Sequence, residues 1–138
     1  MILADTGFWL ALANARDRHH ASAKKALSAI DEPLVTTWPV MTETCHLLLA
    51  RLGEQSARAF IDSATEGAFE IFDLSRDDLP RVSELMVRYS KLPMDLADAS
   101  LVILAERFGS GRILSTDRRD FGAYRWKNRK PFHNLLAL

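Results

Sequence analysis

The 138-residue sequence has a single cysteine, no excess of either charge and no long apolar segment. The lone Cys45 cannot form an internal disulfide, and no spacing of Cys and His indicates a zinc site. The longest apolar run, residues 8–13, is far too short to cross a bilayer, and no basic segment with a cleavage site precedes it. We therefore expect a cytoplasmic protein with no membrane association.

The balance of charges excludes one class of nucleic-acid binder. Lys and Arg together number 18, as do Asp and Glu. A chain with net charge zero is not coated with the basic groups that sequence-blind binding to nucleic acid requires. With 48% hydrophobic and 26% charged residues, and no repeat or long linker, residues 1–138 are predicted to form one globular domain.

Short apolar runs alternate with helical patterns along the chain. The predicted strands cover residues 2–4, 34–36, 69–72 and 112–115, with a small edge strand near 131–133. The predicted helices cover residues 8–14, 17–30, 39–52, 54–66, 76–90 and 95–108. Strands separated by helices imply a parallel sheet covered on both faces. The predicted fold class is α/β, a three-layer α/β/α sandwich with a central parallel sheet of four or five strands.

Asp5 directly follows the first predicted strand. In open α/β sheets, ligands bind in the crevice outside the carboxyl ends of the strands, so a carboxylate there is a candidate for chemistry. An acid between a strand and a helix also commonly serves only as an N-cap. Whether Asp5 is functional therefore depends on whether other acids converge on it.

Two further acids lie on the apolar faces of predicted helices. Glu43 shares a helical face with Val40 and Leu47, and Asp98 shares one with Leu101 and Ala105. A lone carboxylate on a core-facing stripe is unfavourable unless a cation or several donors compensate its charge. We therefore expect positive charge to meet Glu43 and Asp98.

A fourth acid, Asp117, follows the last strong strand as Asp5 follows the first. Two acids at strand ends and two on inward helix faces can converge at the carboxyl edge of the sheet. No lysine or histidine is placed to compensate them, and an all-carboxylate set suits Mg²⁺ or Mn²⁺. The alternative is separate local roles: a capping arrangement of Asp98 with Asp95, a surface position for Glu43 and a turn at Asp117.

The order and spacing of five segments resemble the PIN domain family, and within it the VapC-type ribonuclease toxins of toxin–antitoxin pairs. The segments are DTGFWLAL, DRHHASAKK, the helix with Glu43, DLADASLVILAERFG and ILSTDRRDF. The resemblance implies that Asp5, Glu43, Asp98 and Asp117 hold the metal, with Thr6 and Thr116 as polar neighbours that position water or an acid. Asp95 stands close enough to assist. Many relatives carry a serine at the place of Gly7.

The same resemblance implies a reaction and partners. The expected activity is endonucleolytic hydrolysis of RNA that leaves a 5′-phosphate and a 3′-hydroxyl, with one or two metal ions supplying the chemistry. The expected partner is a small antitoxin that inserts a basic side chain into the acidic site. The chain itself is expected to form a homodimer.

The segment from Arg118 to Lys130 is basic and aromatic, with six Lys or Arg residues and one acid. One interpretation is an RNA-binding surface, in which basic groups hold the backbone and aromatic rings stack on unpaired bases. The other is a solvated basic surface with its aromatics folded underneath. The basic residues are Arg118, Arg119, Arg125, Lys127, Arg129 and Lys130, interleaved with Phe121, Tyr124, Trp126 and nearby Phe132.

Other chemically active residue types are expected to be structural. His19, His20 and His46 are interpreted as caps or surface residues, and Trp9 and Trp38 as packing or interface residues. Three rival functions are less well supported. An aspartate-nucleophile phosphatase would need a second acid at Gly7, and a phospho-acceptor domain would need a lysine near Asp117. A binding module with the same fold and no catalysis is the third.

Overall fold

The computed structural model describes residues 1–136. Its centre is a five-stranded sheet in the order β3-β2-β1-β4-β7, in which every neighbouring pair is parallel. The strands are β1 (Ile2–Ala4), β2 (Leu34–Thr37), β3 (Glu70–Phe72), β4 (Arg112–Leu114) and β7 (His133–Asn134). The predicted parallel sheet is confirmed.

The central strands are buried on both faces. Leu3 of β1 is aligned with Val35 of β2 on one side and with Ile113 of β4 on the other. All three side chains are almost fully buried. A strand covered by helices on both faces needs apolar residues at consecutive positions rather than at alternate ones. Short unbroken apolar runs therefore mark these strands in the sequence.

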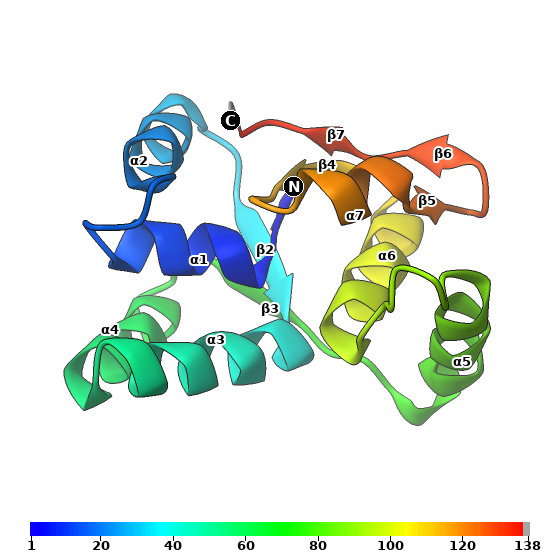
Figure 1. Ribbon diagram of the computed structural model, residues 1–138, viewed down its shortest axis with the longest axis horizontal. Coiled ribbons are helices and arrows are strands. Elements are labelled where there is room, and N and C mark those ends of the chain that lie inside the picture. Colours follow the sequence, from blue (N-terminus) through cyan, green and yellow to red (C-terminus); the bar gives the residue numbers. More distant parts are fainter. Residues whose placement is uncertain (137–138) are drawn as a thin grey trace.

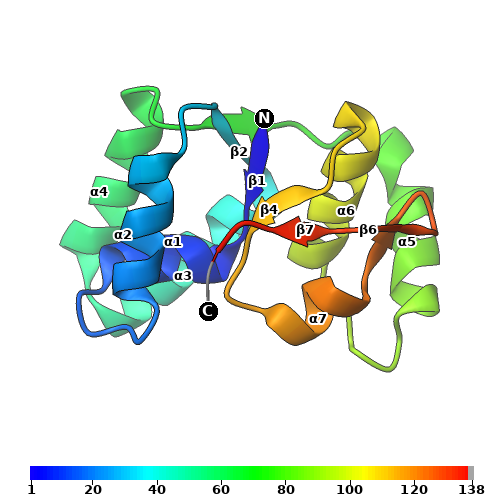
Figure 2. The same ribbon diagram turned by 90° about the horizontal axis from the view of Figure 1, so that it is seen from above.

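Helices cover both faces of the sheet, as Figure 1 shows. On one side lie α1 (Thr6–Ala13), α2 (His20–Ala29), α3 (Trp38–Arg51) and α4 (Glu54–Thr65). On the other side lie α5 (Leu79–Arg88), α6 (Leu96–Phe108) and α7 (Arg118–Ala123), with the short 3-10 helix η1 (Arg76–Asp78) preceding α5. The view from above in Figure 2 shows the same division. The predicted three-layer sandwich is therefore confirmed.

Four helices are capped by polar side chains that accept hydrogen bonds from amides of the first turn. Asp5 caps α1, Thr37 caps α3, Asp95 caps α6 and Asp117 caps α7. Such a cap satisfies a helical amide that has no partner within the helix. Because β1, β2 and β4 are parallel, the helices that follow them start at one edge of the sheet. Asp5 and Asp117 therefore stand at the same edge.

Some predicted boundaries were wrong. The second helix begins at His20 instead of residue 17, because the side chains of Asn14 and Asp17 accept amide hydrogen bonds and hold residues 14–19 as a loop. The helix predicted over residues 76–90 starts with η1 and ends at Arg88. Helix α7 was not predicted, because its six residues are too few to show a helical period. An antiparallel hairpin of β5 (Arg125–Trp126) and β6 (Lys130–Pro131) was not predicted either.

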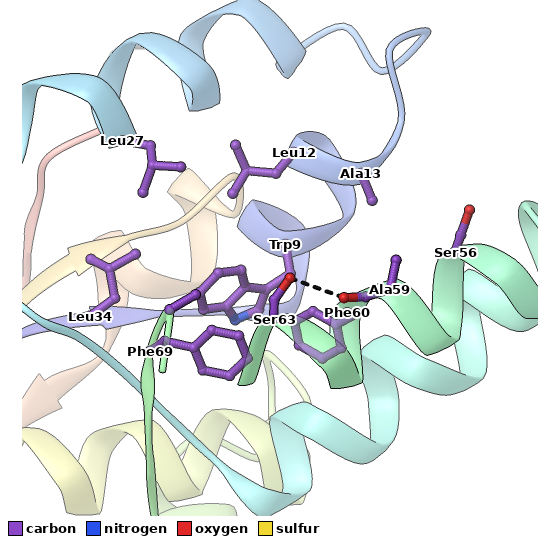
Figure 3. Close-up of a pocket in the computed structure, with 11 residues that line it drawn as sticks. Trp9, Leu12, Ala13, Leu27, Leu34, Ser56, Ala59, Phe60, Ser63 and Phe69 are labelled. Carbon is purple, nitrogen blue, oxygen red and sulfur yellow. Dashed lines mark hydrogen bonds between the residues drawn. The ribbon is translucent and has the colours of Figure 1, made fainter. Parts of the chain in front are cut away.

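An apolar cavity of about 340 Å³ opens between α1, α2 and α4, as Figure 3 shows. Trp9 lines it and packs against Phe60 and Phe69, with ring centroids 5.6 and 4.5 Å away. The predicted packing role of Trp9 is confirmed. No acid lines this cavity, so it is not the place where the predicted carboxylates meet.

No helix among residues 1–136 combines the length and the apolar character that a bilayer span requires.

Candidate active site

The four predicted acids line one cavity of about 450 Å³. Strand ends supply Asp5 and Asp117, while α3 supplies Glu43 and α6 supplies Asp98. The remaining polar and charged lining side chains are Thr6, Asp95, Thr116, Arg119 and Asp120. Residues far apart in the sequence therefore meet at the edge of the sheet where β1 and β4 end. We call this space the carboxylate cavity.

Asp5 is the most enclosed of these acids, with 6% of its surface exposed. Its carboxylate accepts a hydrogen bond from the Phe8 amide at 2.9 Å and another from the Ser115 hydroxyl. Burial raises the pKa of Asp5 to about 6, although these two hydrogen bonds act in the opposite direction. Nearby Asp117 and Glu43 raise the pKa further. Asp5 is therefore both an N-cap and a carboxylate held in an unfavourable electrostatic environment.

Asp98 also has a structural and an electrostatic role. It forms a capping box with Asp95, in which each carboxylate accepts a hydrogen bond from the other residue's amide, at 2.8 and 3.3 Å. The Tyr124 hydroxyl donates a hydrogen bond to Asp98 Oδ2 at 3.3 Å. Burial, followed by the charge of Asp95, raises the pKa of Asp98 to about 7. The capping alternative for Asp98 is thus correct, and the same side chain faces the cavity.

Glu43 and Asp117 complete the set. Burial raises the pKa of Glu43, and the charge of Asp95 contributes to the rise. Asp117 caps α7 by accepting a hydrogen bond from the Asp120 amide at 3.0 Å. Burial raises its pKa as well. Raised pKa values at several acids show that burial, and to a smaller extent the neighbouring carboxylates, disfavours the ionised forms in this cavity.

Little positive charge from the protein reaches the cavity. Of the side chains that line it, only Arg119 carries a positive charge. It pairs with Asp120 at 3.1 Å while 76% of its side chain remains exposed. Among the described residues, the positive charge expected at Glu43 and Asp98 is therefore not supplied by lysine or histidine side chains. Neither lysine nor histidine lines the cavity, as the sequence analysis expected.

The donors suit a hard divalent cation by their chemistry. All are oxygens, namely the carboxylates of the four acids and the buried hydroxyl of Thr6. Within the same residues, no three Asp, Glu, His or Cys side chains are already grouped to hold one ion. Mg²⁺ is commonly held by one or two carboxylates and keeps several water ligands, so a preformed cage is not required. These residues therefore fit a hydrated Mg²⁺ or Mn²⁺ ion.

Comparison with known proteins places this architecture in a family. The PIN domain model matches residues 2–127. The chain belongs to the PIN domain family. The match includes all four acids of the carboxylate cavity and the strands and helices that carry them.

Two curated relatives are ribonucleases of Mycobacterium tuberculosis. Ribonuclease VapC26 is 27% identical over 124 residues, which cover 90% of this chain and 92% of the relative. The 23S rRNA-specific endonuclease VapC20 is 28% identical over 123 residues, covering 89% of this chain and 93% of that protein. The alignments extend over nearly the full length of both proteins.

Solved structures have the same fold. The crystal structure of Mycobacterium tuberculosis VapC20, described as a sarcin–ricin loop cleaving toxin, aligns with a TM-score of 0.80 at 25% identity, covering 86% of this chain and 92% of that one. A toxin–antitoxin complex from Klebsiella pneumoniae aligns with a TM-score of 0.65 at 22% identity, covering 89% and 92%. The second alignment shows only the fold.

Two side chains of this PIN domain that were not predicted hold the acids in place. Ser115 contacts Asp5, and Tyr124 contacts Asp98. Burial, together with the charge of Asp98, raises the pKa of Tyr124 far above its ordinary value, so its hydroxyl stays a donor. Ser115 directly precedes Thr116 at the end of a strand, and that position was a usable signal. The contact of Tyr124 depends on α7, for which the sequence has no clear pattern.

The backbone of Gly7 lies against the side chain of Thr116. A Cβ atom added at Gly7 would lie 1.9 Å from Thr116 Oγ1 and 3.5 Å from Asp5 Oδ1. The side chain of Thr116 would therefore have to rotate away from its present position. The absence of a side chain at residue 7 allows Thr116 to occupy the wall of the cavity.

We expect Gly7→Ala to disturb the cavity more than the fold. Rotation of one threonine side chain costs about 1 kcal/mol, so the melting temperature should change by only a few degrees. RNA cleavage, which depends on the cavity, should fall at least about tenfold, a loss equivalent to about 1.4 kcal/mol. Parallel melting and cleavage assays check this, with Gly122→Ala as the control because a Cβ there meets no atom within 4 Å. Equal activity of the Gly7→Ala variant and the unaltered protein would contradict the expectation.

The aromatic residues of the basic segment lie under the surface. Phe121, Tyr124 and Trp126 are at most 7% exposed, so stacking of RNA bases on these rings is excluded in this structure. The ammonium groups of Lys130 and Lys127 lie 4.8 and 5.8 Å from the Trp126 ring centroid. For these three aromatics, the interpretation with rings folded underneath is correct.

The histidines do not line the carboxylate cavity. His20 Nδ1 is hydrogen-bonded to the Ala11 carbonyl at 2.7 Å, which joins α2 to α1. His19 immediately precedes α2 and accepts a hydrogen bond from Arg18. Both side chains are half-buried, and His19 makes no side-chain capping bond to α2, so the expected cap or surface role is not seen for His19. Cys45 is partly buried against the core.

Proposed function

We propose that this chain is a metal-dependent endoribonuclease and the toxin of a type II toxin–antitoxin pair. The observation that carries the proposal is the meeting of Asp5, Glu43, Asp98 and Asp117 in one cavity at the carboxyl edge of the sheet. Membership of the PIN domain family and the ribonuclease names of two relatives support the same activity. Mg²⁺ or Mn²⁺ is the proposed cofactor.

The cavity supplies the groups that hydrolysis of a phosphodiester requires. A bound divalent ion would activate water and offset the charge that develops on the phosphate oxygens. Asp5, Glu43, Asp98 and Asp117 would hold that ion. Thr6 and Thr116 line the same wall and would orient water or an acid. The proposed products carry a 5′-phosphate and a 3′-hydroxyl.

Neighbouring residues keep the carboxylates oriented. Asp5 is held by the Ser115 hydroxyl and a backbone amide, and Asp98 is held by the Asp95 amide and the Tyr124 hydroxyl. Because of these bonds, the carboxylates would need to move little when a metal ion binds, as is general for hydrogen bonds to the ligands of a metal site. Without a cation, the same carboxylates would repel an RNA phosphate.

Cleavage of total cellular RNA tests the proposal. The purified chain, freed of any partner, is incubated with Mg²⁺, Mn²⁺ or a chelator, and new 5′ ends are mapped by sequencing. We expect cleavage at a few sites, only with metal, and 5′-phosphate ends. A preparation that binds Mn²⁺ by calorimetry and cuts no RNA would contradict the nuclease assignment and favour a PIN domain that only binds.

We also propose a small antitoxin partner. The excess of carboxylates in the cavity would attract a basic side chain from such a protein, and that side chain would displace the metal and the RNA. Coexpression with the neighbouring reading frame tests this: the partner should copurify and suppress cleavage. A toxin that stays alone and active in this experiment would count against the partner. Cytoplasmic location, where both RNA and partner are present, is part of this proposal and is checked by cell fractionation.

A homodimer is the remaining part of the proposal. Three large apolar side chains on or next to α3 are exposed: Trp38 at 51%, Leu49 at 55% and Leu52 at 40%. Exposed apolar side chains along one helix favour association. Light scattering after size exclusion should report a dimer for the unaltered chain and a monomer for Leu49→Glu. A monomeric unaltered chain would contradict the dimer.

A further inference from the structure

A second hollow adjoins the carboxylate cavity and has the opposite charge. It has a volume of about 630 Å³ and is lined by Arg18, His19, Thr116, Asp117, Arg118 and Arg119. Thr116, Asp117 and Arg119 also line the carboxylate cavity. The two spaces therefore share a wall, and a chain that lies in one can continue into the other. We call this second space the arginine hollow.

The guanidinium groups of the hollow retain unused donors. Arg18 donates from Nε to His19 Nε2 at 3.0 Å, and Arg119 donates from Nε to Asp120 at 3.1 Å. Among residues 1–136, neither Arg18 nor Arg118 forms an ion pair with an acid. Arg119 is paired with Asp120. Arg18 and Arg118 together face the single carboxylate of Asp117, which still leaves the hollow with a net positive charge. An anionic group is the ligand that such a set recognises.

The loop that carries Arg18 is held in a defined shape. The side chain of Asn14 accepts a hydrogen bond from the Arg16 amide at 3.0 Å, and that of Asp17 accepts one from the His19 amide at 2.8 Å. The His20 amide donates to the Asp17 carbonyl at 3.0 Å. In Figure 2 this loop between α1 and α2 lies at the same end of the molecule as α7. Two segments about 100 residues apart (18 and 118) thus place their arginines around one space.

We propose that the arginine hollow binds the RNA backbone phosphate next to the one that is cut, with Arg18 and Arg118 as positioning residues. This inference rests on the proposed nuclease function. An RNA strand whose scissile phosphate lies in the carboxylate cavity meets net negative charge there. An adjoining set of guanidinium groups offsets that repulsion and fixes the register of the strand, because phosphate contacts position nucleic acid without reading its bases.

The hairpin that follows α7 provides a matched control. Lys127 and Arg129 are exposed cations on the hairpin between β5 and β6, and neither lines the carboxylate cavity or the arginine hollow. Replacing both by alanine removes two positive charges, as Arg18→Ala with Arg118→Ala does. The two double variants have the same net charge and differ only in where the charge is removed.

Binding is measured by fluorescence anisotropy with a single-stranded RNA in Mg²⁺, with Asp98→Asn in every protein to prevent cleavage. We expect the double variant Arg18→Ala, Arg118→Ala to bind RNA at least about tenfold more weakly. The slope of the logarithm of the binding constant against the logarithm of the salt concentration should become shallower by about 0.7 for each phosphate that the protein no longer neutralises. Lys127 and Arg129 belong to the basic segment that the sequence offers as a candidate RNA-binding surface, but both lie outside the two cavities. The Lys127→Ala, Arg129→Ala pair should therefore change affinity by less than about threefold, because its charges act only at long range. In the active background, the first pair should raise KM and leave kcat nearly unchanged.

The possible results separate the alternatives. Unchanged RNA affinity and salt slope for the Arg18, Arg118 pair would overturn the phosphate site, and so would equal losses of affinity for the two pairs. If the Arg18→Ala, Arg118→Ala variant keeps its RNA affinity but the antitoxin no longer copurifies with it, the hollow binds the protein partner instead. Failure of the unaltered chain to cut any RNA would overturn the nuclease proposal itself, whereas cleavage without any effect of Arg18 and Arg118 would overturn only this inference.

Discussion

Replacing Asp98 by asparagine is expected to abolish metal-dependent RNA cleavage while the chain remains folded. The amide keeps the size of the carboxylate and one acceptor oxygen, so the Tyr124 hydroxyl and the Asp95 amide retain a partner. It removes the charge that would hold a divalent ion. Changes even to residues that only hydrogen-bond to metal ligands reduce activity about 10–100-fold, so removal of a ligand should reduce the rate by at least about 100-fold.

The experiment compares cleavage rates and melting curves of the unaltered chain, Asp98→Asn and Asp62→Asn. Asp62 lies on the exposed face of α4 and lines neither the carboxylate cavity nor the arginine hollow, so its variant should cleave at the normal rate. The melting temperature of Asp98→Asn without metal should equal or exceed that of the unaltered chain, because mutual repulsion among the acids is reduced. A folded Asp98→Asn protein with normal activity would refute the assignment of this cavity as the active site.

The stability of the metal-free protein is expected to fall as the pH rises from about 4 to about 7. Unfolded aspartate has a pKa near 3.9, whereas the folded protein raises the pKa of Asp5 to about 6 and that of Asp98 to about 7. In this window the folded state binds more protons than the unfolded state, so the free energy of unfolding decreases with pH. The change should be on the order of 3 kcal/mol, mostly from Asp5, since Asp98 is only partly buried and solvent screens its charge.

Metal should reverse this dependence. Added Mn²⁺ binds the ionised carboxylates, so it should raise the melting temperature at pH 7.5 and have little effect near pH 5, where protons compete for the same oxygens. Melting curves from pH 4 to 8, with and without Mn²⁺, check both parts. Asp98→Asn should show a shallower dependence on pH and a smaller shift with metal. Stability that rises with pH without metal would contradict the electrostatic account of the cavity.

Much of the fold was predictable because its signals are local. The apolar run of β1 leads directly to Asp5, and Ile113 and Leu114 of β4 are followed, after Ser115 and Thr116, by Asp117. The helical spacing around Glu43 and Asp98 placed both acids on inward faces, and the structure brings them to the cavity. Parallel strands then bring Asp5 and Asp117 to one edge without any further information. The meeting of the four acids could therefore be predicted from the hydrophobic pattern and the helical periodicity.

The remaining parts of the site depend on tertiary contacts that no local pattern records. Tyr124 reaches Asp98 only because α7 turns the chain back toward α6, and Arg18 reaches the hollow only because its loop folds toward α7. The carboxylate of Asp5 caps α1, that of Asp98 belongs to the capping box of α6, and both line the cavity, so a capping role does not exclude a ligand role. A cap needs only one or two lone pairs of a carboxylate, which leaves others for a cation.

Anomalous diffraction from crystals soaked in Mn²⁺ tests the central claim most directly, namely that the carboxylate cavity holds a divalent ion. We predict a manganese peak within about 2.2 Å of oxygens from at least two of Asp5, Glu43, Asp98 and Asp117, with water completing the coordination. The peak should disappear in crystals of Asp98→Asn soaked in the same way. A well-diffracting crystal of the unaltered chain with no peak in the cavity, or with manganese bound only elsewhere, would contradict the account.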